Sequence, residues 1–170
     1  MALTQVINDG LATSGLPAGS VVQVVNVQDG AVATGTTTIA YDDTIMQNTE
    51  GTEFMTLAIT PTNSNHKLKI DVVFNWACNT SNKITTVGLF QDSTANAIAT
   101  VPFTNFYGVA NVPCNTSFTH FMTAGTTSST TFKVRAGSDG AATTSFNGQN
   151  GSRKGGGVLA SSITITEIAV

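Results

Sequence analysis

Charge is scarce in this chain. Asp, Glu, Lys and Arg together make up only 10% of the 170 residues, against roughly 25% in ordinary soluble domains. The basic residues are scattered and the formal net charge is -3, so the chain offers no electrostatic surface for nucleic acid. No apolar run is long enough to span a membrane, and residues 1–20 lack the pattern of a secretory signal. We therefore expect a soluble protein made in the cytosol, without nucleic-acid or membrane partners.

Cysteine and histidine, which often carry catalysis or bind metals, are also rare, with two of each. Cys78 and Cys114 lack the spacing of a metal site, and we expect free structural thiols rather than a disulfide. His66 and His120 have no second histidine or carboxylate close in the sequence, so neither completes a local triad or metal site. The sequence predicts no catalytic residue, no cofactor and no metal, and we do not expect an enzyme.

Two local patterns resemble ligand-binding motifs without meeting their requirements. Asp42 and Asp43 are not followed by carboxylates at the alternating positions of a calcium loop, which favours an ordinary polar loop. Residues 147–157 are rich in glycine and include Lys154, but the order of a phosphate-binding loop is reversed and a strand follows instead of a helix. A glycoside hydrolase needs two carboxylates about 5 to 10 Å apart, and the few acidic residues here lie mostly in turn-like segments.

Alternating apolar residues are what the chain has in abundance, and they indicate β-strands. The clearest stretch is 51–79, where two alternating runs flank the turn-forming residues 61–65. We expect a β-hairpin there, around which the rest of the chain is organised. A second hairpin is expected from 114–124 and 130–136. The residues that share apolar faces in these strands are Met55, Leu57, Ile59, Leu68, Ile70, Val72, Phe74, Trp76, Phe118, His120, Met122, Phe132, Val134 and Ala136.

Further strands complete the prediction of an all-β protein. They are expected at residues 21–27, 36–41, 84–91, 95–101, 141–146 and 158–170. The first carries aliphatic residues on both faces and is predicted to be packed on two sides, whereas the last has the length of a central strand. About eight to ten strands without any helical period predict an antiparallel β-sandwich or jelly roll. A mass of 17.5 kDa suits one domain, which we assign to residues 21–170.

Residues 1–20 precede this domain and have no sustained period of either kind. Leu3, Val6, Ile7 and Leu11 lie there among polar residues and glycines. We interpret the segment as an extended N-terminal arm. Two alternatives stay open at this point: a frayed terminus, or a segment that a partner orders.

Aromatic residues gather in one predicted loop, between Pro102 and Pro113. Phe103, Phe106 and Tyr107 lie close together there. Such a cluster is typical of an exposed contact in an interface. A loop that folds down to cap one end of the sandwich would use the same residues.

Three stretches carry a resemblance to a known group of proteins. Residues 41–76, 91–99 and 151–168 resemble β-sandwich domains of virion proteins from tailed phages and prophages, which are described as tail-fibre-like or capsid-decoration proteins. The resemblance spans roughly residues 20–170, and residues 2–12 look like N-terminal attachment segments of phage structural proteins. It implies a trimeric, TNF-like jelly roll on the virion, without enzyme activity.

Within that resemblance, a short arm and the lack of shaft repeats favour a capsid decoration (cement) protein over a tail fibre. In this interpretation Leu3, Val6, Ile7 and Leu11 contact the major capsid protein, by packing or by adding a strand, and three arms in a homotrimer strengthen the attachment. The protein would be synthesised in the host bacterial cytoplasm and placed on the outer capsid surface. The alternative is a tail-fibre or head-fibre knob that binds a host receptor or carbohydrate, with Phe103, Phe106 and Tyr107 stacking on sugar.

Overall fold

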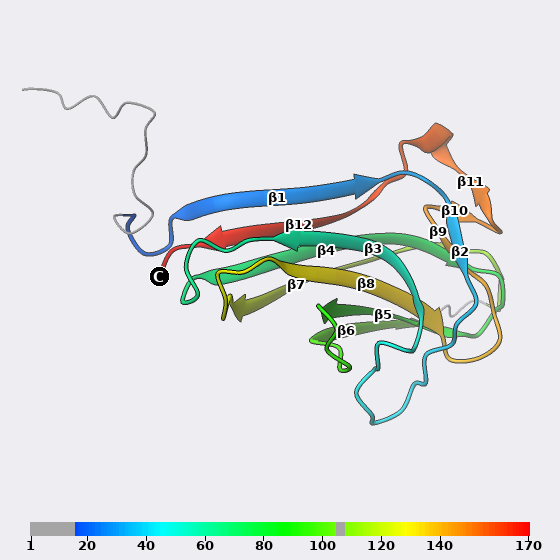
Figure 1. Cartoon of the computed structure of the whole chain (residues 1–170). Coiled ribbons are helices and arrows are strands. Elements are labelled where there is room, and N and C mark those ends of the chain that lie inside the picture. The colour runs from blue at the N-terminus through cyan, green and yellow to red at the C-terminus, as the bar shows by residue number, and fades with distance from the viewer. Residues whose placement is uncertain (1–15, 105–107) are drawn as a thin grey trace, which may run out of the picture.

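The computed structural model of the chain describes residues 16–104 and 108–170. In these residues two antiparallel β-sheets are stacked on each other, and no α-helix is present (Figure 1). In residues 16–104 and 108–170 the helical turn present is a short 3₁₀ turn, η2 (Gly155–Gly157). The protein is therefore an all-β sandwich, as the alternating sequence predicts.

The first sheet contains the longest strand of the described chain at its centre. Its main strands are, in spatial order, β1 (Val21–Asp29), β12 (Ser161–Ile168), β4 (Lys67–Cys78) and β7 (Pro113–Thr123). Two short strands, β9 (Thr144–Phe146) and β2 (Ala33–Gly35), continue the sheet beside the end of β4. The prediction that the last strand of the chain is central is confirmed, because β12 lies between β1 and β4.

The second sheet covers one face of the first. Its strands are, in spatial order, β3 (Thr52–Ile59), β8 (Thr130–Ser138), β5 (Ile84–Gln91) and β6 (Ala99–Thr104). A separate two-stranded ribbon of β10 (Gly148–Gln149) and β11 (Ser152–Arg153) lies in the glycine-rich segment before η2. The chain passes from one sheet to the other after β2, β3, β4, β6, β7 and β8, which gives the jelly-roll arrangement.

Both predicted hairpins are wrong. Strands β3 and β4 flank the turn at 60–66 but belong to different sheets, since β3 pairs with β8 whereas β4 pairs with β12 and β7. The same is true of β7 and β8. Alternation reports which face of a strand is apolar, but not which strand it pairs with. Two consecutive strands with one apolar face each can bury those faces against each other across a sandwich just as well as side by side.

Two further strand predictions need correction. Strand β1 is not packed on two sides: it pairs only with β12 among the described residues, and Val21 and Val24 are exposed. Residues 36–41 form no strand. They belong to a loop that runs to residue 50 and lies on the outer face of the second sheet, where Ile39 and Met46 form a small apolar cluster with Phe90.

The main core fills the space between the sheets. The predicted apolar face of β4 is confirmed, because Leu68, Ile70, Val72, Phe74 and Trp76 are all buried there. The rings of Phe54, Phe74 and Phe146 contact one another, with centroids 5.2 to 5.5 Å apart. The Trp76 indole nitrogen donates a hydrogen bond to the Thr116 hydroxyl at 3.0 Å. The contacts between these rings and the hydrogen bond of Trp76 thus hold the large side chains at the centre in a single arrangement.

Gly137 allows the loop at 36–50 to approach the second sheet. A Cβ atom on Gly137 would overlap the carbonyl oxygen of Thr37 and crowd Ile39. We expect Gly137→Ala to lower the free energy of unfolding by about 1 to 3 kcal/mol, as overpacking does, in urea denaturation followed by fluorescence. Gly140→Ala is the matched control, because its Cβ would meet only the flexible end of Lys83. Equal losses in both variants would contradict this explanation.

Candidate functional site: an open edge of the sandwich

The two long sides of the sandwich differ in how they close. On one side β1 and β3, the edge strands of the two sheets, pack against each other. On the other side the edge strands are β6 and β7, which make fewer contacts. Neither has a second pairing partner among the described residues, so each presents unpaired backbone groups along its free edge. The sandwich is therefore less completely closed between β6 and β7.

Inward-facing side chains at this side are not fully buried. Val101 and Phe103 of β6 align with core positions of β5, while Phe118, His120 and Met122 of β7 align with core positions of β4. All but Phe103 are half-buried, and Phe103 is 41% exposed. We call these five residues the open edge. The sequence predicts the inward orientation of the β7 residues correctly, but it does not reveal that they lie at a side of the sandwich that stays partly open.

His120 is the titratable group of the open edge. It lies opposite Ile70 on the inward face of β7, between Phe118 and Met122 on the same face. Within the described chain its ring has no hydrogen-bond or ion-pair partner. Partial burial lowers the pKa of His120 below the usual value of a histidine. The side chain is therefore neutral at pH 7, and the open edge is an uncharged surface there.

The outer face of the first sheet is the broad surface next to this edge. Its charged residues are Lys67, Lys69 and Asp71, all on β4. The Lys69 ammonium lies 2.7 Å from Asp71, which also accepts a hydrogen bond from the Thr119 hydroxyl at 2.5 Å. Partial burial would raise the pKa of Asp71, but the bonds from Lys69 and Thr119 outweigh it and hold that pKa below its usual value.

Apolar and hydroxyl side chains make up much of the remaining outer face. Val24, Val73 and Phe121 are exposed there, and Phe121 is 58% exposed. Threonine and serine residues lie between them along β12 and β7. Most of this face is thus neutral and partly apolar, which is typical of surfaces that associate with other protein surfaces.

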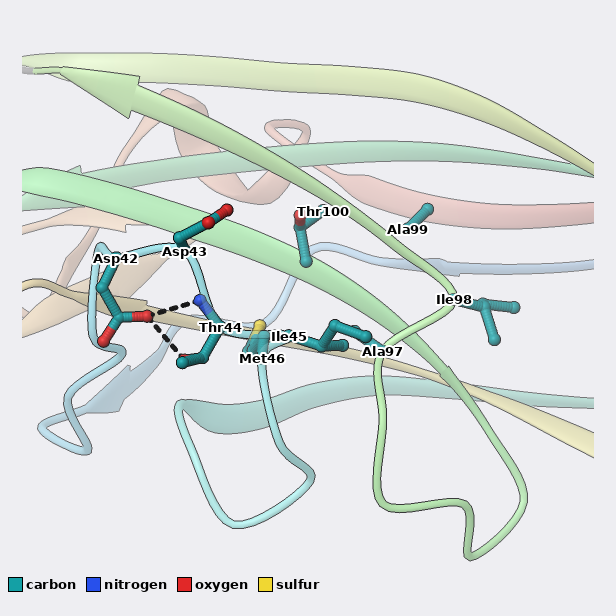
Figure 2. A pocket seen from close by; sticks show the side chains of 9 residues that line it. All are labelled: Asp42, Asp43, Thr44, Ile45, Met46, Ala97, Ile98, Ala99 and Thr100. Carbon is teal, nitrogen blue, oxygen red and sulfur yellow. Dashed lines mark hydrogen bonds between the residues drawn. The ribbon is translucent and has the colours of Figure 1, made fainter.

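A shallow hollow of about 350 Å³ lies where the loop at 36–50 meets β6 and the residues just before it. Figure 2 shows its lining, including the paired aspartates, Ile98 and Thr100. The Asp42 carboxylate turns back to Thr44 and accepts hydrogen bonds from its backbone N–H and its hydroxyl, at 2.8 and 2.5 Å, which lowers the pKa of Asp42. The hollow holds no histidine, cysteine or cation that would work with the two carboxylates.

Glu167 is a buried carboxylate near the end of the sandwich where the chain terminates. Its side chain is inaccessible to solvent and lies 2.7 Å from the Nδ1 atom of His66, which is also buried. It accepts hydrogen bonds from the backbone N–H and the hydroxyl of Thr62, both at 2.8 Å, and from the Gln23 amide at 2.6 Å. Burial would raise the pKa of Glu167, but these hydrogen bonds outweigh it and lower that pKa.

This network has a structural role. It joins β1, β12 and the turn at 60–66, and the adjacent backbone is held by the hydrogen bonds of Gly19 and Ser20 with Ala169. Gly19 and Ser20 are thus part of the β-sandwich domain, which begins slightly before residue 21. Sequence reasoning missed the pair because His66 and Glu167 are 101 positions apart, and no local spacing signals such a contact.

Chemistry that requires activated groups is not assembled in the described residues. Cys78 and Cys114 are free thiols, as predicted. Burial and the neighbouring Cys78 raise the pKa of Cys114, so it remains a protonated thiol rather than a nucleophilic thiolate. Residues 16–104 and 108–170 contain no cluster of three or more histidine, cysteine, aspartate or glutamate side chains suited to a metal ion. In the same residues, no helix is long and apolar enough to cross a membrane.

Most of the residues proposed as contacts from the sequence fall outside the described part of the chain. This applies to the arm residues Leu3, Val6, Ile7 and Leu11, and to Phe106 and Tyr107 of the aromatic cluster. Phe103 is described. It lies in β6 rather than in a loop, and its ring packs edge-on against Trp76 with the centroids 5.6 Å apart. Phe103 thus contacts the core on one side, while the rest of its side chain stays exposed.

Comparison with known proteins gives fold likenesses only. No family model matches the chain, and no curated protein sequence matches it. Dimeric latent PorU from Porphyromonas gingivalis has a TM-score of 0.43 and 8% identity over 91% of this chain and 14% of its own. Eiger TNF from S. frugiperda has a TM-score of 0.44 and 8% identity over 86% and 93%.

A viral particle protein shows a comparable likeness. The structure of the Gx strain of infectious bursal disease virus has a TM-score of 0.40 and 11% identity, over 87% of this chain and 37% of the viral chain. The chain thus spans 14% of PorU and 37% of the viral protein. At these identities and scores the likenesses carry no inference about function.

Proposed function

We propose that this protein is a non-enzymatic structural subunit of a tailed-phage virion, assembled as a homotrimer and bound to the major capsid protein as a decoration protein. The observation that carries the assembly part of this proposal is the open edge. Half-buried apolar side chains and two unpaired strand edges lie there side by side, and covering them removes apolar surface from water. The neutral outer face of the first sheet offers a second surface for the same purpose.

The virion part of the proposal is supported by the sequence resemblance of residues 41–76, 91–99 and 151–168 to phage virion proteins. The lack of an assembled catalytic or metal site in the described residues is compatible with a purely structural role. We assign capsid attachment to the arm at residues 1–20, on the outer surface of the head. The hydrogen bonds of Gly19 and Ser20 to Ala169 provide a fixed point from which such an arm would extend.

Removal of residues 1–17 tests this attachment. We expect the truncated protein to keep its fold and its oligomeric state but to lose co-sedimentation with phage heads stripped of this protein, because three arms bind together and are lost together. Circular dichroism and light scattering check the fold and the oligomer. Retained binding by the folded, truncated protein would refute the arm as the attachment segment.

A matched pair of variants tests whether the aliphatic side chains of the arm, rather than the presence of an arm of that length, bind phage heads. One variant replaces the four aliphatic residues Leu3, Val6, Ile7 and Leu11 with serine, and the other replaces Thr4, Gln5 and Asn8 with serine. The first should lose binding to heads as the truncation does, and the second should keep it. Equal binding by both would show that the aliphatic side chains are not the contact.

A fibre knob is the second candidate function, and the exposed part of Phe103 favours it, because an exposed aromatic ring can stack on the face of a sugar. Immunogold labelling of purified virions separates the two functions. Label spread over the head supports decoration. Label confined to the tail tip, together with binding of the protein to host-surface glycans, would replace it with the knob.

A further inference from the structure

The chain carries two surfaces with little charge, the open edge and the outer face of the first sheet, and these could contact each other in different copies of the chain. Among the described residues, neither β6 nor the inward face of β7 carries a charged side chain at pH 7. On the outer face of the first sheet the Asp71 carboxylate is paired with Lys69, and Lys67, at one end of that face, bonds to the Thr123 hydroxyl. A partner rich in charge would have to bury unpaired charges against these surfaces, which is costly. A second copy of this chain brings one surface with little charge to another, and the low content of charged residues, 10% of the chain, gives little repulsion.

His120 is the position in the open edge whose charge can change. Covering the edge would move its half-exposed ring into apolar surroundings, between Phe118 and Met122 and opposite Ile70. A neutral imidazole tolerates that transfer, whereas an imidazolium loses hydration without gaining a counter-ion. Association and protonation at this position therefore oppose each other.

Among the described residues, no group near His120 offers the imidazolium a compensating negative charge. The charged and titratable groups around it are Lys67, Lys69 and Asp71 on the opposite face of β4, Cys114 on β7, Glu167 two strands away on β12, His66 beside Glu167, and Asp92 at the end of β5. The two acidic groups that do not lie on the opposite face are already engaged. Glu167 is held by His66, Thr62 and Gln23, and Asp92 accepts hydrogen bonds from Thr130 and Thr131.

We propose that a second copy of this chain covers the open edge, and that His120 makes this self-association sensitive to pH, strong when the ring is neutral and weak when it is protonated. This inference rests on the proposed function, because it concerns the subunit contact of that assembly. The direction of this pH effect follows from the thermodynamic linkage between association and protonation of His120. Association lowers the pKa of His120 further, so association is full above the pKa of the free subunit and weakens as pH falls through it.

The test is the oligomeric state of the whole chain between pH 7.5 and pH 5, measured by sedimentation velocity over a concentration series. Each unit by which association lowers the pKa of His120 weakens binding about tenfold per subunit at low pH. We expect weaker association at pH 5 than at pH 7.5 for the natural chain, by up to that factor, which is reached in full only below both pKa values. His120→Phe keeps an apolar ring at the same place and should associate equally at both pH values.

A matched control variant carries a titrating histidine away from the open edge. Ser128 lies exposed in the loop between β7 and β8, so adding Ser128→His to the His120→Phe variant restores a titrating imidazole away from the edge. Association of this double variant should stay independent of pH. Circular dichroism at both pH values checks that the subunits remain folded, and Glu167 does not titrate in this range because its pKa is lowered from 4.5.

The outcomes separate this inference from the proposed function. A natural chain that is monomeric at every pH would overturn both. Oligomers that are equally stable at pH 7.5 and pH 5 would leave the proposed assembly standing and overturn the role of His120. If the oligomers of the His120→Phe variant also weaken in acid, another group causes the pH sensitivity, and the role of His120 is likewise overturned.

Discussion

Replacing Glu167 with alanine should lower the free energy of unfolding by about 3 to 5 kcal/mol, the range found when one member of a buried pair is removed. The variant leaves the buried His66 ring, the Thr62 hydroxyl and backbone N–H, and the Gln23 amide without their common acceptor. Unsatisfied buried donors retain the full cost of leaving water. Urea denaturation at pH 7 measures the loss.

Glu53→Ala is the matched control for this prediction. The Glu53 carboxylate lies 3.4 Å from Arg135 and 3.7 Å from Lys133, but all three side chains are partly open to solvent. Such surface pairs contribute about 0 to 1 kcal/mol. If Glu53→Ala and Glu167→Ala cost the same, the burial of the Glu167 network does not determine its energetic role.

The Glu167 carboxylate also predicts how the stability of the folded chain depends on pH. The pKa of Glu167 in the folded chain is lowered from 4.5, so the unfolded chain binds this proton more readily. The contribution of Glu167 is therefore complete above pH 4.5 and is lost as pH falls through the lower folded-state pKa. Thermal unfolding of the natural chain and Glu167→Gln between pH 3 and pH 7 should show the difference between them shrinking in acid. A constant difference would contradict this linkage.

Phe74→Ala should also cost about 3 to 5 kcal/mol, the range for a large aromatic residue removed from a core. Phe74 is fully buried, and its ring contacts both Phe54 and Phe146, with centroid distances of 5.5 and 5.2 Å. Its removal leaves a cavity at the centre of the sandwich that the two neighbouring rings cannot fill without leaving their rotamers. The midpoint of urea denaturation measures this loss.

Phe121→Ala is the matched control for Phe74, because it removes the same side chain from a surface position on the first sheet. Phe121 is 58% exposed on the outer face of β7. We expect its removal to change the stability of the single subunit by no more than about 0.5 kcal/mol. A loss as large as that of Phe74→Ala in the single subunit would contradict the described packing of these two residues.

How much of the candidate site the sequence predicts can be seen from β6 and β7. The alternation of Phe118, His120 and Met122 predicts that they share a face, and they do. Nothing in that pattern indicates that β7 lies at the edge of its sheet, because an edge strand and a central strand can have the same period. The strand expected at 95–101 ends before Phe103, which the sequence places in the following loop. The structure places both Pro102 and Phe103 in β6, and an edge strand tolerates proline.

The sequence alone determined the class of the fold. Scarce charge, abundant alternation and the lack of helical period require strands with one apolar face, and burial of those faces requires a sandwich. The apolar face of β4 follows from local spacing, because it depends on residues close together in the chain.

Only the tertiary structure decided which strands pair, which side of the sandwich remains open, and which distant groups meet. The pairing of β3 with β8 instead of β4 and the contact of His66 with Glu167 both join residues far apart in sequence. Such contacts depend on the free energy of the whole arrangement, in which loop closure costs little more for long connections than for short ones. Local periodicity in the sequence does not indicate which distant strands or side chains come together.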